Sequence, residues 1–212
     1  MDASFWLQKW EDNNIAFHAS EPNSALVKHF PALSLSPGSR VFLPLCGKTL
    51  DIAWLLSQGY RVAGAELSAI AIEQLFTELD VKPSITEAGN LTHYSAPNLD
   101  IFVGDIFNLS REVLGPVDAI YDRAAIVALP PDMRARYTPH LMEITDTAPQ
   151  LIVSFEYDQT QMAGPPFSVS NQEITQHYQE SYALTRLTSK NIPGGLKGKC
   201  EATKNIWLLR SC

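Results

Sequence analysis

Residues 40–48 read RVFLPLCGK, and residues 61–66, which follow an apolar helix pattern, read RVAGAE. An apolar strand thus reaches a tight turn, a buried helix crosses over, and a second strand ends on the carboxylate of Glu66. This order is typical of the first unit of a nucleoside-binding α/β domain. Glu66 lies 66 − 47 = 19 positions after Gly47, close to the spacing of about 20 at which an acid reaches ribose hydroxyls.

The loop between this strand and helix contains one glycine, Gly47. A phosphate-binding P-loop needs another glycine five positions earlier, where Phe42 stands, and Pro44 removes a backbone N–H that would bind phosphate. The G-x-G-x-x-G fingerprint is absent too, so NAD becomes a minor alternative. A nucleoside without phosphates, such as S-adenosyl-L-methionine, fits better, because Glu66 can accept hydrogen bonds from both ribose hydroxyls. The competing interpretation is an exposed acid at a strand end and a glycine that serves only the turn.

Length and composition limit the classes of protein. With 212 residues and 45% apolar composition, the chain can bury one substantial core, which predicts a single domain over residues 1–212. A formal charge of −7 argues against binding nucleic acid or an anionic membrane by charge alone. No apolar run approaches the roughly 20 residues that span a bilayer, and no secretion signal is visible. Three scattered cysteines indicate a reducing, cytoplasmic compartment, and nothing in the sequence requires more than a monomer.

Apolar and β-branched runs alternate with helical patterns along the chain. The predicted strands are residues 41–45, 61–66, 100–104, 117–122, 151–157, 182–188 and 204–210. Helices are predicted at 50–56, after the capping residue Ser68, at 132–144 and at 171–181. The alternation predicts an α/β fold with a mostly parallel, Rossmann-like sheet and helices on both faces. The turn-rich segment 191–199 joins the last two strands, so we expect an antiparallel C-terminal edge.

Charged side chains follow several of the predicted strands. Asp105 comes after the third strand and is followed by Ile106, a pair that suits the polar edge and the apolar face of an adenine ring. Arg123 ends the fourth strand beside Asp122, and a surface ion pair is the alternative explanation. In open α/β sheets, ligands bind beyond the carboxyl ends of the strands. The residues expected to converge there are Leu45, Glu66, Asp105 and Arg123.

The same residues resemble a known family, the thiopurine S-methyltransferases. The matching phrases are FWLQKW at 5–10, FLPLCGK at 42–48, GAELS at 64–68, YDRAA at 121–125 and GPPFSV at 164–169. The phrase ALPPDMR at 128–134 is similar to the bacterial branch. The resemblance implies a class I methyltransferase fold with a seven-stranded sheet. It also implies methyl transfer from S-adenosyl-L-methionine, leaving S-adenosyl-L-homocysteine, to the sulfur of small aromatic or heterocyclic thiols. Bacterial members would also accept selenium or tellurium species.

The resemblance assigns cofactor positions as well. These are Trp10, Leu45, Glu66, Ile106 and Arg123. Trp6 and Trp10 are four residues apart and share one face of a predicted helix. We expect Trp6 to pack in the core, Trp10 to face the cofactor, and residues 1–20 to form a mobile lid that excludes water.

The acceptor side is predicted to include Phe17, Arg123 and Phe167. Arg123 is the one cation at a ligand-facing strand end, so it would orient an anionic acceptor or lower its pKa. Methyl transfer from a sulfonium is an in-line displacement that depends on alignment and needs no covalent enzyme intermediate. Cys46 is interpreted as a small packed residue, and the five histidines show no metal-ligand spacing.

Two other classes of function stay open at this point. The first is a methyltransferase-like module that binds the nucleoside without turnover. The second is a P-loop-like nucleotidase, which Phe42 and Pro44 oppose.

Overall fold

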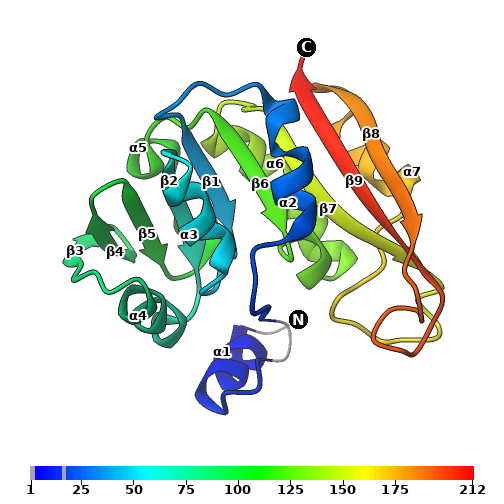
Figure 1. Ribbon diagram of the computed structural model, residues 1–212, viewed down its shortest axis with the longest axis horizontal. Coiled ribbons are helices and arrows are strands. Elements are labelled where there is room, and N and C mark those ends of the chain that lie inside the picture. The colour runs from blue at the N-terminus through cyan, green and yellow to red at the C-terminus, as the bar shows by residue number, and fades with distance from the viewer. Residues whose placement is uncertain (1–2, 16–17) are drawn as a thin grey trace.

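A computed structural model describes residues 3–15 and 18–212, which form a nine-stranded mixed sheet covered by helices (Figure 1). The strand order is β3-β4-β5-β2-β1-β6-β7-β9-β8. The strands are β1 (Arg40–Pro44), β2 (Arg61–Glu66), β3 (Ser84–Ala88), β4 (Leu91–Ala96), β5 (Leu99–Val103), β6 (Ala119–Arg123), β7 (Gln150–Tyr157), β8 (Tyr182–Asn191) and β9 (Ala202–Ser211). The α-helices are α1 (Ala3–Glu11), α2 (Ser24–His29), α3 (Leu50–Ser57), α4 (Ala69–Glu78), α5 (Arg111–Leu114), α6 (Pro131–Ile144) and α7 (Asn171–Tyr178). Short 3-10 helices are η1 (Phe30–Leu33), η2 (Ile106–Asn108) and η3 (Ile126–Ala128).

The centre of the sheet is parallel and buried. Strand β1 is buried along its whole length and pairs in parallel with β2 and β6, while β5 and β7 extend the parallel region on either side. A strand covered on both faces needs apolar residues at consecutive positions, which explains the unbroken run at residues 41–43. Strands β9 and β8 close one side in antiparallel orientation. The predicted α/β class with an antiparallel C-terminal edge is therefore confirmed.

The predicted number of strands was too low by two. All seven predicted strands are present, but β3 and β4 add an antiparallel hairpin to β5. Strand β3 is exposed over most of its length and so lacks the apolar pattern that identifies a buried strand. The available signal was the Gly89-Asn90 pair between Ala88 and Leu91, a dipeptide typical of tight hairpins.

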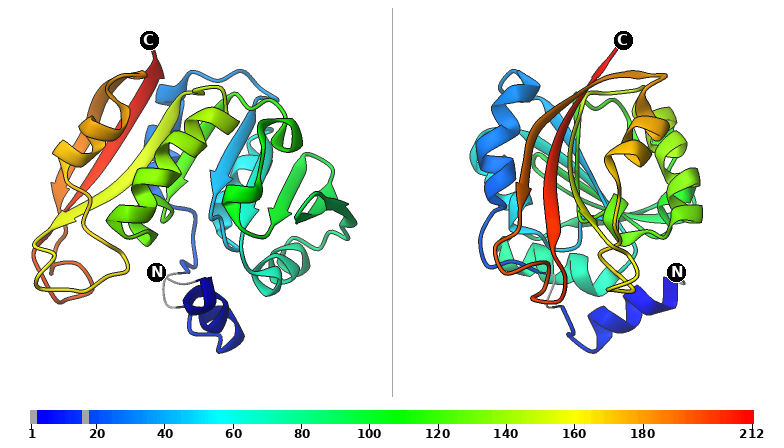
Figure 2. Two further views of the ribbon diagram at one scale, coloured as in Figure 1. Left: turned by 180° about the vertical axis from the view of Figure 1, so that it is seen from behind. Right: turned by 90° about the vertical axis from the view of Figure 1, so that its right-hand side faces the viewer.

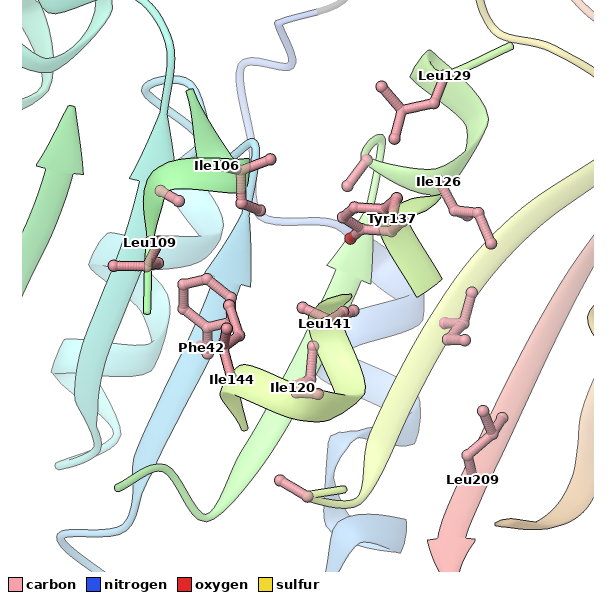
Figure 3. Packing of buried hydrophobic residues seen from close by; sticks show 14 of the residues in the cluster. Phe42, Ile106, Leu109, Ile120, Ile126, Leu129, Tyr137, Leu141, Ile144 and Leu209 are labelled. Carbon is pink, nitrogen blue, oxygen red and sulfur yellow. The ribbon is translucent and has the colours of Figure 1, made fainter. Parts of the chain in front are cut away.

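Helices cover both faces of the sheet and enclose two cores (Figure 2). Helices α2, α3 and α4 pack on one face, where Leu26, Ile52 and Phe76 are buried. Helices α6 and α7 pack on the other, and Figure 3 shows Tyr137 and Leu141 of α6 among the apolar side chains of that core. Each face of the parallel sheet is thus covered by helices, as its apolar strands require.

Local sequence signals begin and end these helices, and the predicted cap at Ser68 is present. The Ser68 hydroxyl accepts a hydrogen bond from the Ala71 N–H at 3.3 Å and caps α4. Ile72, Leu75 and Phe76 are buried along the inner face of this helix. After α3 the chain turns at Gly59, whose φ of +81° is a conformation that favours glycine.

The carboxyl ends of the parallel strands lie at one side of the sheet, which we call the carboxyl edge and define by Leu45, Glu66, Gly104, Arg123 and Tyr157. Helix α1 lies beyond this edge and packs against α4 rather than on a face of the sheet (Figures 1 and 2). The β8–β9 turn lies at the same edge, because Ala202 pairs with Tyr157. No helix in the described ranges is long and apolar enough to cross a bilayer.

Candidate functional site

The buried carboxylate of Glu66 connects the loops that follow β1 and β2. One oxygen accepts the Gly47 N–H at 2.8 Å and the other accepts the Ser68 N–H at 2.9 Å. Burial raises the pKa of this carboxyl, and the backbone N–H groups that favour the charged form act against that shift. A carboxylate has about four acceptor positions, and the Leu67 N–H is a further backbone donor that favours the charged form of Glu66, so the backbone donors do not fill all of them.

The loop after β1 is shaped by two residues with positive φ. Leu45 has a φ of +48° and Gly47 a φ of +53°. A Cβ atom placed on Gly47 would lie 3.1 Å from the Trp10 ring, which is closer than most real Cβ contacts. Glycine is therefore favoured here both by the backbone conformation and by the close approach of the α1 indole. Trp10 is buried, whereas Trp6, which was predicted to pack in the core, is only partly buried. That Trp10 faces the cofactor stays a prediction.

The loop after β5 presents Asp105 and Ile106. The Asp105 side chain is exposed and caps η2 by accepting the Phe107 N–H at 3.0 Å. Ile106 is buried, and its carbonyl lies 2.8 Å from Nε2 of His140 on α6. The contact with His140 fixes the position of the apolar residue that was predicted to face an adenine ring.

Arg123 ends β6 and is partly exposed. His18 and Lys204 lie within electrostatic range of its guanidinium, and both respond to its charge. For His18, burial is the largest cause of a lowered pKa, followed by Lys48, with a further contribution from Arg123. The carboxyl edge therefore places an acid at β2 and positive charge at β6 and β9.

Comparison with known proteins decides the family. The model of the family described as thiopurine S-methyltransferase matches residues 1–204. The chain belongs to this family. A thiopurine S-methyltransferase of Xanthobacter autotrophicus is 59% identical over 210 residues, covering 99% of both chains. Another, of Teredinibacter turnerae, is 52% identical over 209 residues and covers 99% of this chain and 97% of its own.

Solved structures of low sequence identity share the fold. A 1,6-didemethyltoxoflavin-N1-methyltransferase of Burkholderia thailandensis, with bound S-adenosylhomocysteine, superposes with a TM-score of 0.66 at 14% identity, covering 99% of this chain and 87% of its own. A magnesium protoporphyrin IX methyltransferase of Synechocystis also gives 0.66, at 12% identity, and covers 99% and 100%. The predicted family and the predicted class I methyltransferase fold are both confirmed.

The structure brings most of the predicted site residues to one edge. Leu45 and Gly47 lie in the loop after β1, and Trp10 and Glu66 contact that loop. Asp105 and Ile106 follow β5, beyond β2, and Arg123 ends β6 on the other side of β1. Phe167 lies in the segment between β7 and α7, where its N–H donates to the Val127 carbonyl at 2.6 Å. Phe17 lies outside the described residues. The ligand contacts of all these residues stay predictions.

Two hollows lie beside the carboxyl edge. One, of about 320 Å³, is lined by Lys48 and residues of α4. The other, of about 530 Å³, is lined by Glu156 and the β8–β9 turn. Neither hollow is lined by Glu66 or Arg123, so both hollows are separate from the predicted cofactor and acceptor residues at the ends of β2 and β6.

Cys46 has no nucleophilic character at neutral pH. Its thiol is buried, and burial together with the neighbouring Glu66 carboxylate raises its pKa well above the ordinary value. This agrees with its interpretation as a small packed residue. In the part of the chain that the structure describes, no group of three or more His, Cys, Asp or Glu side chains is arranged to hold a metal ion.

Sequence reasoning missed the structural role of Asp122, which precedes Arg123 in β6. Asp122 points to the opposite face of β6, is completely buried, and accepts the Tyr137 hydroxyl at 2.8 Å and the Ile126 N–H at 3.0 Å. These bonds fix the turn from β6 into η3, where Ala124 has a φ of +62°. The ion pair considered for Asp122 and Arg123 is absent from the described residues, because consecutive side chains of a strand point to opposite faces of the sheet.

Burial gives Asp122 a pKa of about 6, against an ordinary value of 3.8. The folded protein thus favours the protonated form, and the contribution of this group to stability is largest below the unfolded pKa and is lost as the pH rises through 6. Asp122→Asn fixes a neutral side chain in the same space. We expect the free energy of unfolding of the wild type, relative to this variant, to increase by roughly 1–3 kcal/mol between pH 8 and pH 4.

Urea titrations across that pH range measure this difference. Asp80→Asn, at an exposed aspartate, serves as the control for a general effect of charge removal. A difference between wild type and Asp122→Asn that stays constant over the whole range would contradict the shifted titration of Asp122.

Proposed function

We propose that this chain transfers the methyl group of S-adenosyl-L-methionine to the sulfur of small aromatic or heterocyclic thiols, thiopurines among them. Membership of the family supports the reaction class. The single observation that carries the proposal at the level of the site is the buried Glu66 carboxylate, which joins the loops after β1 and β2 at the carboxyl edge. Selenium or tellurium species with comparable polarisability are proposed as further acceptors.

The residues at the carboxyl edge fit the cofactor. Glu66 would accept from the ribose hydroxyls, and the glycine at position 47 leaves the loop without a side chain beside them. Trp10 and Leu45 would line the methionine part, while Ile106 would pack on the adenine face with Asp105 at its edge. None of these contacts needs a phosphate-binding nest, in agreement with the single glycine of the loop.

When bound, the cofactor supplies an electrophilic methyl group on a sulfonium. The chain contributes alignment and exclusion of water, because strong fixed charge against the sulfonium would favour the ground state over the transition state. Arg123 would hold the acceptor as an anion and favour its thiolate form, which is the better nucleophile. Phe17 and Phe167 would flank the acceptor ring. The displacement is direct, and no enzyme residue forms a covalent intermediate.

Hydrogen bonds that hold the segment around Phe167 in place support the proposed position of Phe167 beside the acceptor. Lys197 of the β8–β9 turn donates to the Pro165 carbonyl at 2.9 Å, and Arg134 of α6 donates to the Ser168 carbonyl at 3.4 Å. Both contacts hold residues close to Phe167 against the body of the domain.

We further propose that the chain acts as a monomeric, single-domain cytoplasmic enzyme.

The function is tested with purified protein, S-adenosyl-L-methionine and a panel of aromatic thiols. Methylated thiol and S-adenosylhomocysteine should form in equal amounts. We expect Arg123→Ala to fold normally and to lose turnover by about one to two orders of magnitude, because the acceptor loses a charged partner. Arg123→Lys should recover part of the activity.

Two outcomes would contradict these assignments. Cofactor binding without methyl transfer to any acceptor would favour a binding module over an enzyme. Unaltered kinetics of Arg123→Ala at saturating cofactor would remove Arg123 from the mechanism.

Helix α1 is proposed to act as a lid. It packs on α4 and brings Trp10 onto Gly47, but it lies beyond the carboxyl edge and covers neither face of the sheet. A helix with few supporting contacts is expected to open locally and to become ordered when a ligand binds beneath it. S-Adenosylhomocysteine should slow amide hydrogen exchange in residues 3–15, while exchange in α7 stays the same. Exchange in α1 that does not respond to the ligand would contradict the lid.

A further inference from the structure

Lys204 brings a second positive charge to the acceptor half of the carboxyl edge, and no sequence motif indicated it. Arg123 pairs with Val153 of β7, which in turn pairs with Ile206 of β9. Lys204 is two residues from Ile206 and therefore lies on the same face, displaced toward the carboxyl edge. Two strand spacings, about 10 Å in total, separate the backbones of β6 and β9, a gap that long arginine and lysine side chains can close together.

The electrostatic surroundings of Lys204 agree with a position near Arg123. Burial lowers the pKa of Lys204, Arg123 lowers it further, and the nearby Asp51 carboxylate raises it. The Lys204 ammonium is 3.5 Å from the Asn23 side-chain oxygen. Arg123 and Lys204 are thus held close enough to repel each other.

The negative charge nearby is insufficient to balance this pair. Asp51 is buried, with one oxygen accepting the Asn23 N–H at 2.6 Å and the other without a hydrogen-bond partner. No carboxylate in the described ranges forms an ion pair with Arg123 or Lys204. With Lys190 directly opposite Lys204 on β8, three cations lie near the one carboxylate that acts on Lys204. Like charges that are partly removed from water are stabilised by an anion that binds between them.

The order of the strands assigns the two cations different tasks. Glu66 lies on β2, Arg123 on β6, and Lys204 on β9, so the three residues follow one another along the carboxyl edge. Arg123 is nearer to the proposed cofactor and would face the reacting sulfur. Lys204 is farther away and would face the distal part of the acceptor.

We propose that Lys204 is a specificity-determining residue that binds a negatively charged group on the acceptor, distinct from the sulfur that Arg123 orients. This inference rests on the proposed function and adds a substrate class to it: aromatic thiols that carry an acidic substituent are preferred over neutral thiols of the same shape. The preference should weaken as salt increases, because the pair is partly exposed to solvent.

The test compares an aromatic thiol that bears a ring carboxylate with the matching carboxamide. Lys204→Met removes the charge and keeps the apolar stem, Lys204→Arg restores a charge, and Lys82→Met is the matched control. Lys82 is exposed and lies just before β3, at the opposite end of the strand order from β9. We expect Lys204→Met to lower kcat/KM about tenfold for the carboxylate, mainly through KM, and less than twofold for the carboxamide. Lys204→Arg should retain the preference, and Lys82→Met should leave both acceptors unchanged.

Equal losses of kcat/KM for both acceptors in Lys204→Met would overturn the proposal and leave Lys204 as a structural partner of Asp51. No loss of kcat/KM for either acceptor would overturn it as well. Thermal unfolding of each variant separates these outcomes from misfolding. Calorimetry with the two S-methylated products, in the presence of S-adenosylhomocysteine, measures the same discrimination without turnover. A wild type that does not prefer the carboxylate product over the carboxamide overturns the role of Lys204, whether or not methyl transfer is observed.

Discussion

The hydrogen bonds of the Glu66 carboxylate are the constraint on which the rest of the site depends. They join the loop after β1 to the loop after β2, so the two central strands end in one fixed structure. A buried carboxylate costs free energy unless it is hydrogen-bonded, and the two backbone N–H groups offset that cost. The bonds also fix the backbone at Gly47, against which Trp10 packs. The position of α1 over the edge therefore follows from an acid at the end of β2.

Charge changes sign along the carboxyl edge. The acid at β2 suits a neutral ribose, which donates hydrogen bonds, whereas Arg123 and Lys204 suit an acceptor that is an anion. Between them lies the end of β1, where the chain supplies no charged side chain until Lys48. Such a distribution would place the donor and the acceptor on either side of β1, with Arg123 beside the acceptor sulfur and no fixed charge from the chain directly against the sulfonium. This arrangement suits the proposed transfer from a sulfonium to a thiolate.

The elements with strong patterns could be predicted from sequence. The buried runs of β1 and β2, the cap at Ser68 and the spacing of Gly47 from Glu66 each reflect a local rule, and local rules are visible in a single sequence. The exposed strand β3 follows no such rule, because its residues pack against nothing that would impose an apolar pattern. Lys204 and Asp122 were missed for another reason. Their roles depend on strand register and on which face a side chain takes, and only the folded sheet fixes both.

The most direct test of the account is calorimetric titration of S-adenosylhomocysteine into the wild type and Glu66→Gln, at a temperature at which both are shown to be folded. Glutamine keeps one acceptor oxygen but turns an N–H group toward a backbone donor, so it cannot keep both loops and the ribose in place. We predict a dissociation constant at least about tenfold higher for Glu66→Gln. Equal dissociation constants for the two proteins would contradict the central role of this carboxylate.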